Sequence, residues 1–428
     1  MPTQRLKVPS FAQAKQAVRV LIASHGHPEF SRGGAEIAAH ELFTALRQRH
    51  GFESWFLGCS DPAHHHSAAA ISQPFSGREY LYNIRDFDLF KLSNRDARFP
   101  GAFRSLLREL NPRVVHFHHY VNLGVEAFLH VRETLPNSKI VLTLHEYLAL
   151  CHHSGQMVTR PHLTLCHESS PLGCTRCFHD LTAADFFMRK LYVSRFFELV
   201  DLFVAPSRFL SERYVAWGVP QQRMAVIENL TCGRPERPAR APVSSVDSSV
   251  LRVGYFGRIS PFKGIGVLME AAKILQERGA ENIVFEIHGD YSSQPAEVQD
   301  EFLDRLKTLG RTVKFCGPYD PMRVDELMQS VQLVLMPSIW WENSPIVIQE
   351  AMRNRRPVVC SNIGGMAEKV RDSIDGFHFP VGDALALAAL LQRLAQSPER
   401  LAAMTETMAA PNSTVVERHV ELYESLAA

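Results

Sequence analysis

Short apolar runs alternate with amphipathic segments along most of this chain of 428 residues. The runs are rich in Val, Ile, Leu and Phe, and the segments between them place apolar residues at helical spacing, as in Ile37, Leu42 and Leu46. This alternation is typical of parallel sheets whose strands are joined by crossover helices. It predicts strands at 17–24, 113–118, 139–146, 202–207, 251–258, 283–290, 313–318, 331–338 and 356–362.

The alternation is interrupted at residues 231–249, TCGRPERPARAPVSSVDSS, which are rich in proline and serine and lack periodicity. This composition is typical of a linker or an exposed loop. The sequence therefore predicts an α/β protein with two Rossmann-like, doubly wound domains, at 1–230 and 250–412, and a final helix at 413–428 that can return to the N-terminal domain. Because ligands of such sheets bind beyond the carboxyl ends of the strands, we expect a site in the cleft where the two domains face each other.

The composition, with 46% hydrophobic and 21% charged residues, is that of an ordinary globular protein. A formal net charge of +1 gives no reason to expect a nucleic-acid partner. No apolar run approaches the roughly 20 residues that cross a bilayer, and the first run, VRVLIAS, is expected to be a strand rather than a signal peptide. We therefore expect a cytoplasmic protein, in which the eight cysteines are thiols or metal ligands rather than disulfides.

Glycines and basic residues follow the first predicted strand of the C-terminal domain, in GYFGRISPFKG (254–264). Gly257 and Arg258 come directly after the strand, and Lys263 and Gly264 begin the next helix. A glycine turn and a helix N-terminus offer free N–H groups to an anion, and the two cations suit phosphate oxygens. The segment fits neither the Walker nor the dinucleotide-binding pattern. The alternative is that Arg258 and Lys263 are surface cations beside a turn.

Two acidic residues, Glu342 and Glu350, lie around the start of another helix, in MPSIWWENSPIVIQEAMR (336–353). Pro345 suits the first turn of that helix and Ser344 suits its N-cap, so we predict a helix from Pro345 to Arg353. The two carboxylates can then flank an elongated ligand, since their oxygens accept hydrogen bonds from vicinal sugar hydroxyls. The alternative is that Glu342 only supplies negative charge near a helix start, a stabilisation of about 0.3–1 kcal/mol.

Three motifs follow one another in the C-terminal half: GRISPFKG, the E-x7-E pair within ENSPIVIQEA, and NIGGMAEKVRD followed by GFHFPVGD. In this order they resemble the retaining nucleotide-sugar glycosyltransferases of family 4, which have the GT-B fold. The resemblance covers most of the chain and is strongest at 251–385. It implies a hexosyltransferase that moves a sugar, with retention, from a UDP- or GDP-sugar to a hydroxyl of a growing cell-surface or lipid-linked glycan.

The resemblance also implies roles for the C-terminal residues. Glu350 would hold the ribose, Glu342 would lie near the donor sugar, and Arg258 and Lys263 would stabilise the leaving diphosphate. These cations take the part that a metal plays elsewhere, so no cofactor is required for catalysis. Glu342 is not expected to be a covalent nucleophile. Backbone groups at the helix start would face the sugar and phosphate, at Asn343, Ser344 and Ile346, as would the turn at Gly257.

In the N-terminal half, Gly33 and Gly34 match the family's glycine loop, which closes on the donor diphosphate; only glycine lets another group approach the backbone so closely. His145 ends a predicted strand and matches the histidine beside the donor sugar. His118 ends a neighbouring strand and is expected on the acceptor side, with a structural role as the alternative. The chain departs from the family pattern at Glu146, where the usual H-D reads H-E, and at IENLTCG (227–233).

Four cysteines crowd into one segment, about 151–180, with the spacing C-x14-C-x7-C-x2-C. This spacing fits a tetrahedral structural zinc site on the acceptor-side domain. Free thiols are the main alternative, followed by a disulfide or an iron–sulfur cluster. The predicted ligands are Cys151, Cys166, Cys174 and Cys177.

The segment 185–203, DFFMRKLYVSRFFELVDLF, mixes aromatic residues with Arg189, Lys190 and Arg195. It could contact the inner face of a membrane, as a lipid-linked acceptor would require, or pack as an amphipathic helix on its own sheet.

Two other functions remain open. One is a nucleotide-sugar epimerase or phosphorylase, and the other is a non-catalytic sugar-nucleotide-binding subunit of a glycan assembly complex.

Overall fold

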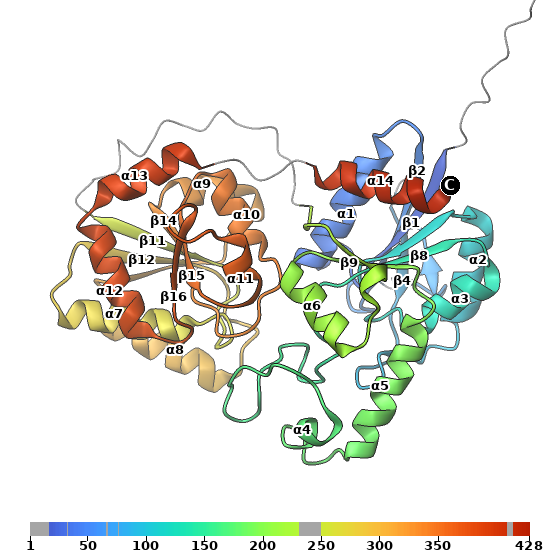
Figure 1. Cartoon of the computed structure of the whole chain (residues 1–428), viewed down its shortest axis with the longest axis horizontal. Coiled ribbons are helices and arrows are strands. Elements are labelled where there is room, and N and C mark those ends of the chain that lie inside the picture. Colours follow the sequence, from blue (N-terminus) through green and yellow to red (C-terminus); the bar gives the residue numbers. More distant parts are fainter. Residues whose placement is uncertain (1–16, 32, 66, 76, 231–249, 409–413) are drawn as a thin grey trace, which may run out of the picture.

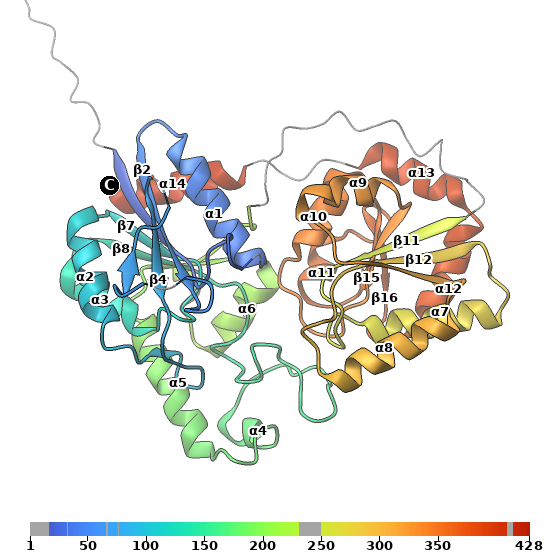
Figure 2. The same cartoon turned by 180° about the vertical axis from the view of Figure 1, so that it is seen from behind.

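Two α/β units lie side by side in the computed structural model, which describes residues 17–31, 33–65, 67–75, 77–230, 250–408 and 414–428 (Figure 1). Each unit is built on a largely parallel sheet covered by helices, and the view from behind in Figure 2 shows the same separation. The prediction of an α/β fold with two Rossmann-like domains is confirmed. The predicted linker at 231–249 and residues 1–16 lie outside the described residues.

The N-terminal sheet has eight strands, which are parallel except for the β3–β4 pair. The direction of the connections changes between β1 and β7. β2, β4 and β3 lie on one side of β1, and β7, β8, β9 and β10 follow one another on the other side. The strands, in sheet order, are β10 (Met224–Val226), β9 (Leu202–Ala205), β8 (Lys139–Thr143), β7 (Val114–Phe117), β1 (Val18–Ala23), β2 (Phe52–Ser60), β4 (Glu79–Asn83) and β3 (Ile71–Ser72). The helices are α1 (Gly34–Arg47), α2 (Phe99–Leu110), α3 (Glu126–Thr134), α4 (Pro171–Thr175), α5 (Ala183–Phe197) and α6 (Arg208–Trp217).

The C-terminal sheet has six parallel strands, with β11 and β14 adjacent at its centre. The strands, in sheet order, are β13 (Val313–Gly317), β12 (Ile283–His288), β11 (Leu251–Phe256), β14 (Leu333–Met336), β15 (Val358–Ser361) and β16 (Gly376–Phe379). The helices are α7 (Ile265–Glu277), α8 (Ala296–Thr308), α9 (Val324–Gln329), α10 (Ile346–Arg353), α11 (Gly364–Lys369), α12 (Ala384–Ala395) and α13 (Pro398–Thr407). Because β11 and β14 are neighbours, the loops that follow them meet at one edge of the sheet.

The last helix, α14 (Val415–Ala427), lies on the N-terminal domain, where it packs against α1, β1 and β7 (Figure 1). Its Tyr423 is fully buried, and the Tyr423 hydroxyl lies 2.5 Å from Nδ1 of His116 at the end of β7. The chain therefore leaves the N-terminal domain after residue 230, builds the C-terminal domain with residues 250–408 and returns.

Two helices differ from the sequence prediction. α10 begins at Ile346 with Pro345 as its N-cap, and Ser344 does not cap it; the Ser344 hydroxyl instead hydrogen-bonds to Glu228 of the N-terminal domain. α5 begins earlier than predicted because Thr182 and Asp185 form a capping box. Arg189 on α5 is buried, and its guanidinium donates to the carbonyls of Phe90, Leu148 and Ala149, so it does not belong to an exposed cationic face.

No helix among the described residues combines the length and apolar character needed to cross a lipid bilayer.

Candidate active site

The loops after β11 and β14 bring Lys263 and Glu342 together. Nζ of Lys263 lies 2.6 Å from Oε1 of Glu342. The same oxygen accepts hydrogen bonds from the Ser338 hydroxyl at 2.8 Å and the Trp340 indole N–H at 2.9 Å. Glu342 is only 5% exposed, and the three donors fix the position of its carboxylate. Both are predicted site residues, and the structure brings them into direct contact.

The turn between β11 and α7 depends on two glycines with positive φ. Gly257 has φ +130°, and Gly264 has φ +75°. A Cβ on Gly264 would lie 1.8 Å from the carbonyl oxygen of Pro337, so only glycine allows the two loops to approach this closely. Arg258 follows Gly257 with an exposed side chain, which leaves its guanidinium accessible at the mouth of this turn.

The loop that carries Glu342 is held from both sides by Asn343 and Gly365. The Ser207 hydroxyl, from the N-terminal domain, donates to Oδ1 of Asn343 at 2.7 Å, and Nδ2 of Asn343 donates to the His145 carbonyl at 3.4 Å. On the other side, the Gly365 N–H donates to the Glu342 carbonyl at 2.8 Å. A Cβ on Gly365 would lie 1.5 Å from the Asn343 carbonyl oxygen, which explains the Gly-Gly pair at the start of α11.

The glycine loop of the N-terminal domain faces the start of α10. A Cβ on Gly34 would lie 3.2 Å from Cδ1 of Ile346, so the two domains touch where the sequence predicts that a diphosphate binds. Gly33 lies against Glu36, whose carboxylate is buried. Burial opposes ionisation of Glu36, but hydrogen bonds from His25 and Ser31 outweigh it and lower the pKa of Glu36 to about 2.

His145 ends a row of histidines within the N-terminal domain. Its Nε2 lies 3.2 Å from Nδ1 of His118, and the His118 ring lies against that of His116 at a centroid distance of 4.3 Å. Burial lowers the pKa of His145 to about 3 and holds the pKa values of His116 and His118 well below the usual range. All three are therefore neutral at neutral pH, so His145 can offer a hydrogen bond without a charge.

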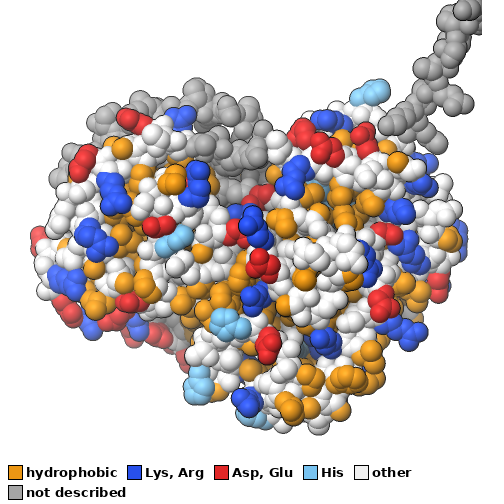
Figure 3. Space-filling view, in the orientation of Figure 1, with side chains coloured by type: hydrophobic (Ala, Val, Ile, Leu, Met, Phe, Trp, Pro, Cys, Tyr) orange, Lys and Arg blue, Asp and Glu red, His pale blue; other side chains and the backbone are white. Residues whose placement is uncertain are grey.

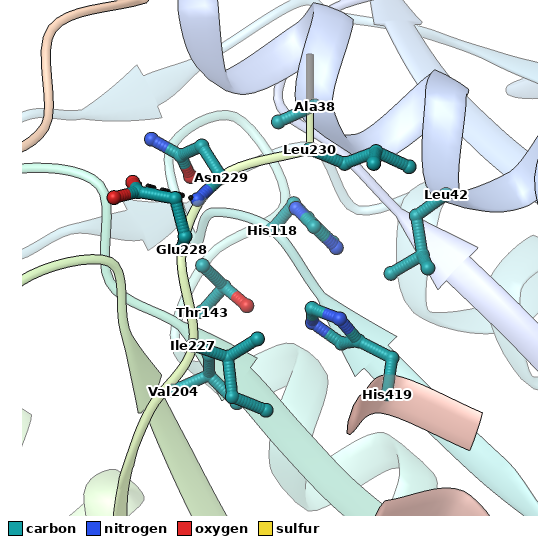
Figure 4. Close-up of a pocket in the computed structure, with 10 residues that line it drawn as sticks. All are labelled: Ala38, Leu42, His118, Thr143, Val204, Ile227, Glu228, Asn229, Leu230 and His419. Carbon is teal, nitrogen blue, oxygen red and sulfur yellow. Dashed lines mark hydrogen bonds between the residues drawn. The ribbon is translucent and has the colours of Figure 1, made fainter. Parts of the chain in front are cut away.

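His118 is 3% exposed and lies behind His145. Figure 4 shows His118 and His419 lining a cavity, about 10 Å³ in volume, together with Thr143, Glu228 and Asn229. This place suits the structural alternative for His118 better than contact with an acceptor.

Glu146, where the chain departs from the family pattern, accepts a hydrogen bond from the Tyr120 hydroxyl at 2.9 Å and another from the Leu148 N–H. Burial raises the pKa of Glu146 to about 8, so this carboxyl is mostly protonated at neutral pH. It supports the segment that follows His145.

Glu350 lies one and a half turns into α10 and is half-buried. Burial raises the pKa of Tyr319, and the nearby Glu350 raises it further, which places Glu350 near the segment that follows β13. The Tyr319 ring meets Phe256 and His288 edge-on, and Tyr319 and His288 border a cavity of about 790 Å³ on the C-terminal domain.

Several contacts between the domains were not predicted from the sequence. Lys369 on α11 pairs with Glu228 and donates to the Pro206 carbonyl at 2.9 Å. The Glu368 carboxylate accepts the N–H groups of Arg208 and Phe209 at the start of α6, each at 2.9 Å. Glu368 and Lys369 belong to the motif MAEKV, but a single sequence does not show which residues they contact.

Two groups of potential metal ligands converge within 4.8 Å in the described part of the chain: His27, His40 and Glu79, and Glu286, His288 and Cys316. The four predicted cysteines are free thiols in the loop between β8 and α5, and no three of them converge that closely in this conformation.

The chain matches two family models. Residues 32–230 match the model described as Glycosyltransferase Family 4, and residues 241–409 match the model described as Glycosyl transferases group 1. These two ranges correspond to the two halves of the fold.

Curated relatives match the chain over part of its length. It is 27% identical over 238 residues to the amylovoran biosynthesis glycosyltransferase AmsK of Erwinia amylovora, a match that covers 54% of this chain and 56% of that protein. It is 31% identical over 184 residues to the lipopolysaccharide 1,2-N-acetylglucosaminetransferase of Salmonella typhimurium, covering 41% and 48%. The chain thus spans about half the length of these curated relatives.

The fold as a whole is similar to that of Anabaena Alr3699/HepE, solved in complex with UDP. The TM-score is 0.65 at 18% identity, and the match covers 95% of this chain and 100% of that one. Identity this low supports the shared fold alone. Together, the two family models and the shared fold show that the chain belongs to the family 4 type of glycosyltransferases and has the GT-B fold.

Proposed function

We propose that the protein is a retaining hexosyltransferase that moves a sugar from a UDP- or GDP-sugar to a hydroxyl of a growing cell-surface or lipid-linked glycan. The observation that carries this proposal is the meeting of Lys263, Glu342 and the start of α10 opposite Gly34, at the carboxyl ends of both sheets. Relatives named for the synthesis of amylovoran and lipopolysaccharide support the class of acceptor.

In the proposed reaction, charge builds on the diphosphate as the bond between the sugar and its oxygen breaks. Lys263, Arg258 and the N–H groups at the start of α10 stabilise that charge, so the site needs no metal for this step. A side chain at Gly34 would press on Ile346, so glycine allows this loop to lie close to the start of α10. Glu350 holds the ribose hydroxyls.

Glu342 and neutral His145 border the donor sugar in this proposal. Oε1 of Glu342 already accepts three hydrogen bonds, which suits an electrostatic and positioning role better than covalent attack on the sugar. The acceptor hydroxyl would then attack from the face that the diphosphate leaves and pass its proton to the departing phosphate oxygen, and the configuration at the anomeric carbon is retained. His145 can bind a sugar hydroxyl without adding a charge.

The test offers the purified chain a panel of UDP- and GDP-sugars with hydroxyl acceptors, followed by mass spectrometry and by NMR of the anomeric configuration. We expect net transfer with retention, and loss of transfer in Glu342→Gln with nucleotide binding preserved. Isomerised donor without transfer would instead identify an epimerase. Nucleotide binding without any turnover, on every donor and acceptor, would identify a non-catalytic subunit.

We also propose that the N-terminal domain contacts the cytoplasmic face of an anionic membrane through α4 and α5. Four large apolar side chains there are each at least 53% exposed: Leu172, Phe187, Met188 and Leu191. Apolar atoms gather at this lower edge in Figure 3, and the exposed cations Arg176, Lys190 and Arg195 lie on the same two elements or beside them. Apolar side chains framed by cations suit the boundary between anionic headgroups and acyl chains.

Sedimentation with vesicles tests this contact. The wild-type chain should bind vesicles that contain phosphatidylglycerol more strongly than vesicles of phosphatidylcholine alone. The variant Phe187→Ser with Leu191→Ser should lose this binding, while Leu385→Ser, on an exposed residue of the C-terminal domain, should keep it. Equal binding of all three proteins would count against the proposal.

A further inference from the structure

The four cysteines lie in a loop that passes between the two domains. Residues 144–182 leave β8, run below both sheets and return to α5 (Figures 1 and 2). Apart from the single turn α4, this loop contains no helix or strand. A long loop of this kind needs some other source of order.

The parts of the loop that carry the four cysteines are joined by backbone hydrogen bonds. The Gly155 N–H donates to the Cys151 carbonyl at 3.0 Å, and the Cys166 N–H donates to the Met157 carbonyl at 2.8 Å. The Cys177 N–H donates to the Cys174 carbonyl at 3.0 Å, so these two cysteines share one turn. None of the four is in a disulfide.

Each sulfur also has a hydrogen-bonding backbone group beside it. The Arg160 N–H lies 3.4 Å from Sγ of Cys177, and Sγ of Cys166 lies 3.1 Å from the Glu168 carbonyl oxygen. Backbone groups of His153 and Met157 serve Cys151, and one of Ser170 serves Cys174. These contacts tie each cysteine side chain to the backbone of the loop.

The loop contacts Phe262 and Trp341, which directly precede Lys263 and Glu342 in the sequence. The Trp341 indole N–H donates to the Cys166 carbonyl at 2.9 Å, and the Trp341 ring meets that of His167 at 5.3 Å. The ring of His153 meets that of Phe262 at 5.8 Å. Both contacts cross from the N-terminal to the C-terminal domain.

We propose that Cys151, Cys166, Cys174 and Cys177 bind one zinc ion, and that this ion holds the loop against Phe262 and Trp341 and so positions Lys263 and Glu342. Zn–S bonds of about 2.3 Å place tetrahedral sulfurs about 3.8 Å apart, which is the spacing that the loop adopts when the ion is bound. Zinc binding depends only on the four cysteines. The effect of the ion on the position of Lys263 and Glu342 rests on the proposed transferase function.

The first test counts metal in the purified full-length chain. We expect about one zinc per chain by elemental analysis. Cys174→Ser with Cys177→Ser should lose the zinc and melt at a lower temperature. Cys316→Ser, which removes one ligand of the separate Glu286–His288–Cys316 group, should keep the zinc. Cobalt in place of zinc should give the absorption of a tetrahedral thiolate site. Iron with sulfide in place of zinc, or no metal in protein purified under reductant, would overturn the zinc site.

The second test reads the position of Trp341 without any sugar. Removing zinc from the wild-type chain with a chelator should change its tryptophan fluorescence. The variant Trp341→Phe should still bind zinc, but its tryptophan fluorescence should change much less when the zinc is removed. Chelation should also lower transfer by at least about tenfold while UDP or GDP still binds. Unchanged fluorescence and full transfer after the zinc is removed would overturn the positioning effect, and the metal count would stand independently of either result.

Discussion

Lys263 and Glu342 form an ion pair across two adjacent loops, with 2.6 Å between Nζ and Oε1. The sequence gives these two residues separate partners, the phosphate and the sugar. The structure joins them, so in the proposed reaction a diphosphate bound at Lys263 shares the charge of this lysine with Glu342. If the proposal holds, donor binding and the position of the Glu342 carboxylate are coupled through one lysine.

Lys263→Ala should lower donor turnover by at least about tenfold, because it removes a fixed charge from the leaving group. It should also lower the melting temperature, since Glu342 is left buried without its cation. Lys273→Ala, on the exposed face of α7, is the matched control and should change neither. The double variant Lys263→Ala with Glu342→Gln should recover stability but not turnover. Wild-type rates in Lys263→Ala would remove this lysine from the donor site.

Glu350→Gln should weaken binding of the free nucleoside diphosphate. Losing a charge-assisted hydrogen bond to the ribose costs about 1.5–3 kcal/mol. Calorimetry with UDP and GDP measures the change, and Glu270→Gln on exposed α7 serves as the control. An unchanged dissociation constant for the preferred nucleotide would contradict the assignment to the ribose.

Gly365→Ala should disrupt the loop that carries Glu342, because its Cβ would lie 1.5 Å from the Asn343 carbonyl oxygen. We expect a lower melting temperature and a loss of transfer. Gly266→Ala is the control: nothing lies within 4 Å of its Cβ, and alanine suits the first turn of α7, so stability should stay equal or rise by about 0.4–1 kcal/mol. If both variants behave alike, the close packing of α11 on this loop is not required.

Glu146→Gln should change how stability depends on pH. Burial raises the pKa of Glu146 from 4.5 to about 8, so the folded state holds a proton that the unfolded chain releases. This contribution is present in full below pH 4.5 and is lost as the pH rises to about 8. Urea denaturation of both proteins between pH 5.5 and 8.5 should therefore show a steeper loss of stability in the wild type. Parallel curves would mean that the Glu146 carboxyl is already ionised in the folded protein.

The strands that can be predicted from the sequence are those in which most residues are apolar and buried. All nine predicted strands are present, and apolar residues make up most of each, although β11, β12 and β13 each include one charged residue. The edge strands β10 and β16 are short, and β2 carries Ser54 and Gly58 among its apolar residues, so periodicity alone did not predict them. Their place is set by pairing with a neighbouring strand.

The same limit applies to the site. Lys263, Glu342 and the required glycines can be recognised because their residue types are unusual at the end of a strand. Glu228, Glu368 and Lys369 cannot, because each is an ordinary charged residue whose partner lies about 140 or more positions away. Ser344 was assigned to a cap by local rules, but a partner in the other domain takes its hydroxyl.

The return of α14 to the first sheet makes the C-terminal domain an insertion rather than a tail. Both ends of residues 250–408 are tied to one body, whose core includes Val420 and Tyr423 from the far end of the chain. A C-terminal domain exchanged with that of another glycosyltransferase would have to be inserted as an internal segment, with both junctions kept. Ending the chain at residue 408 would remove a helix from the N-terminal domain and leave the C-terminal domain unshortened.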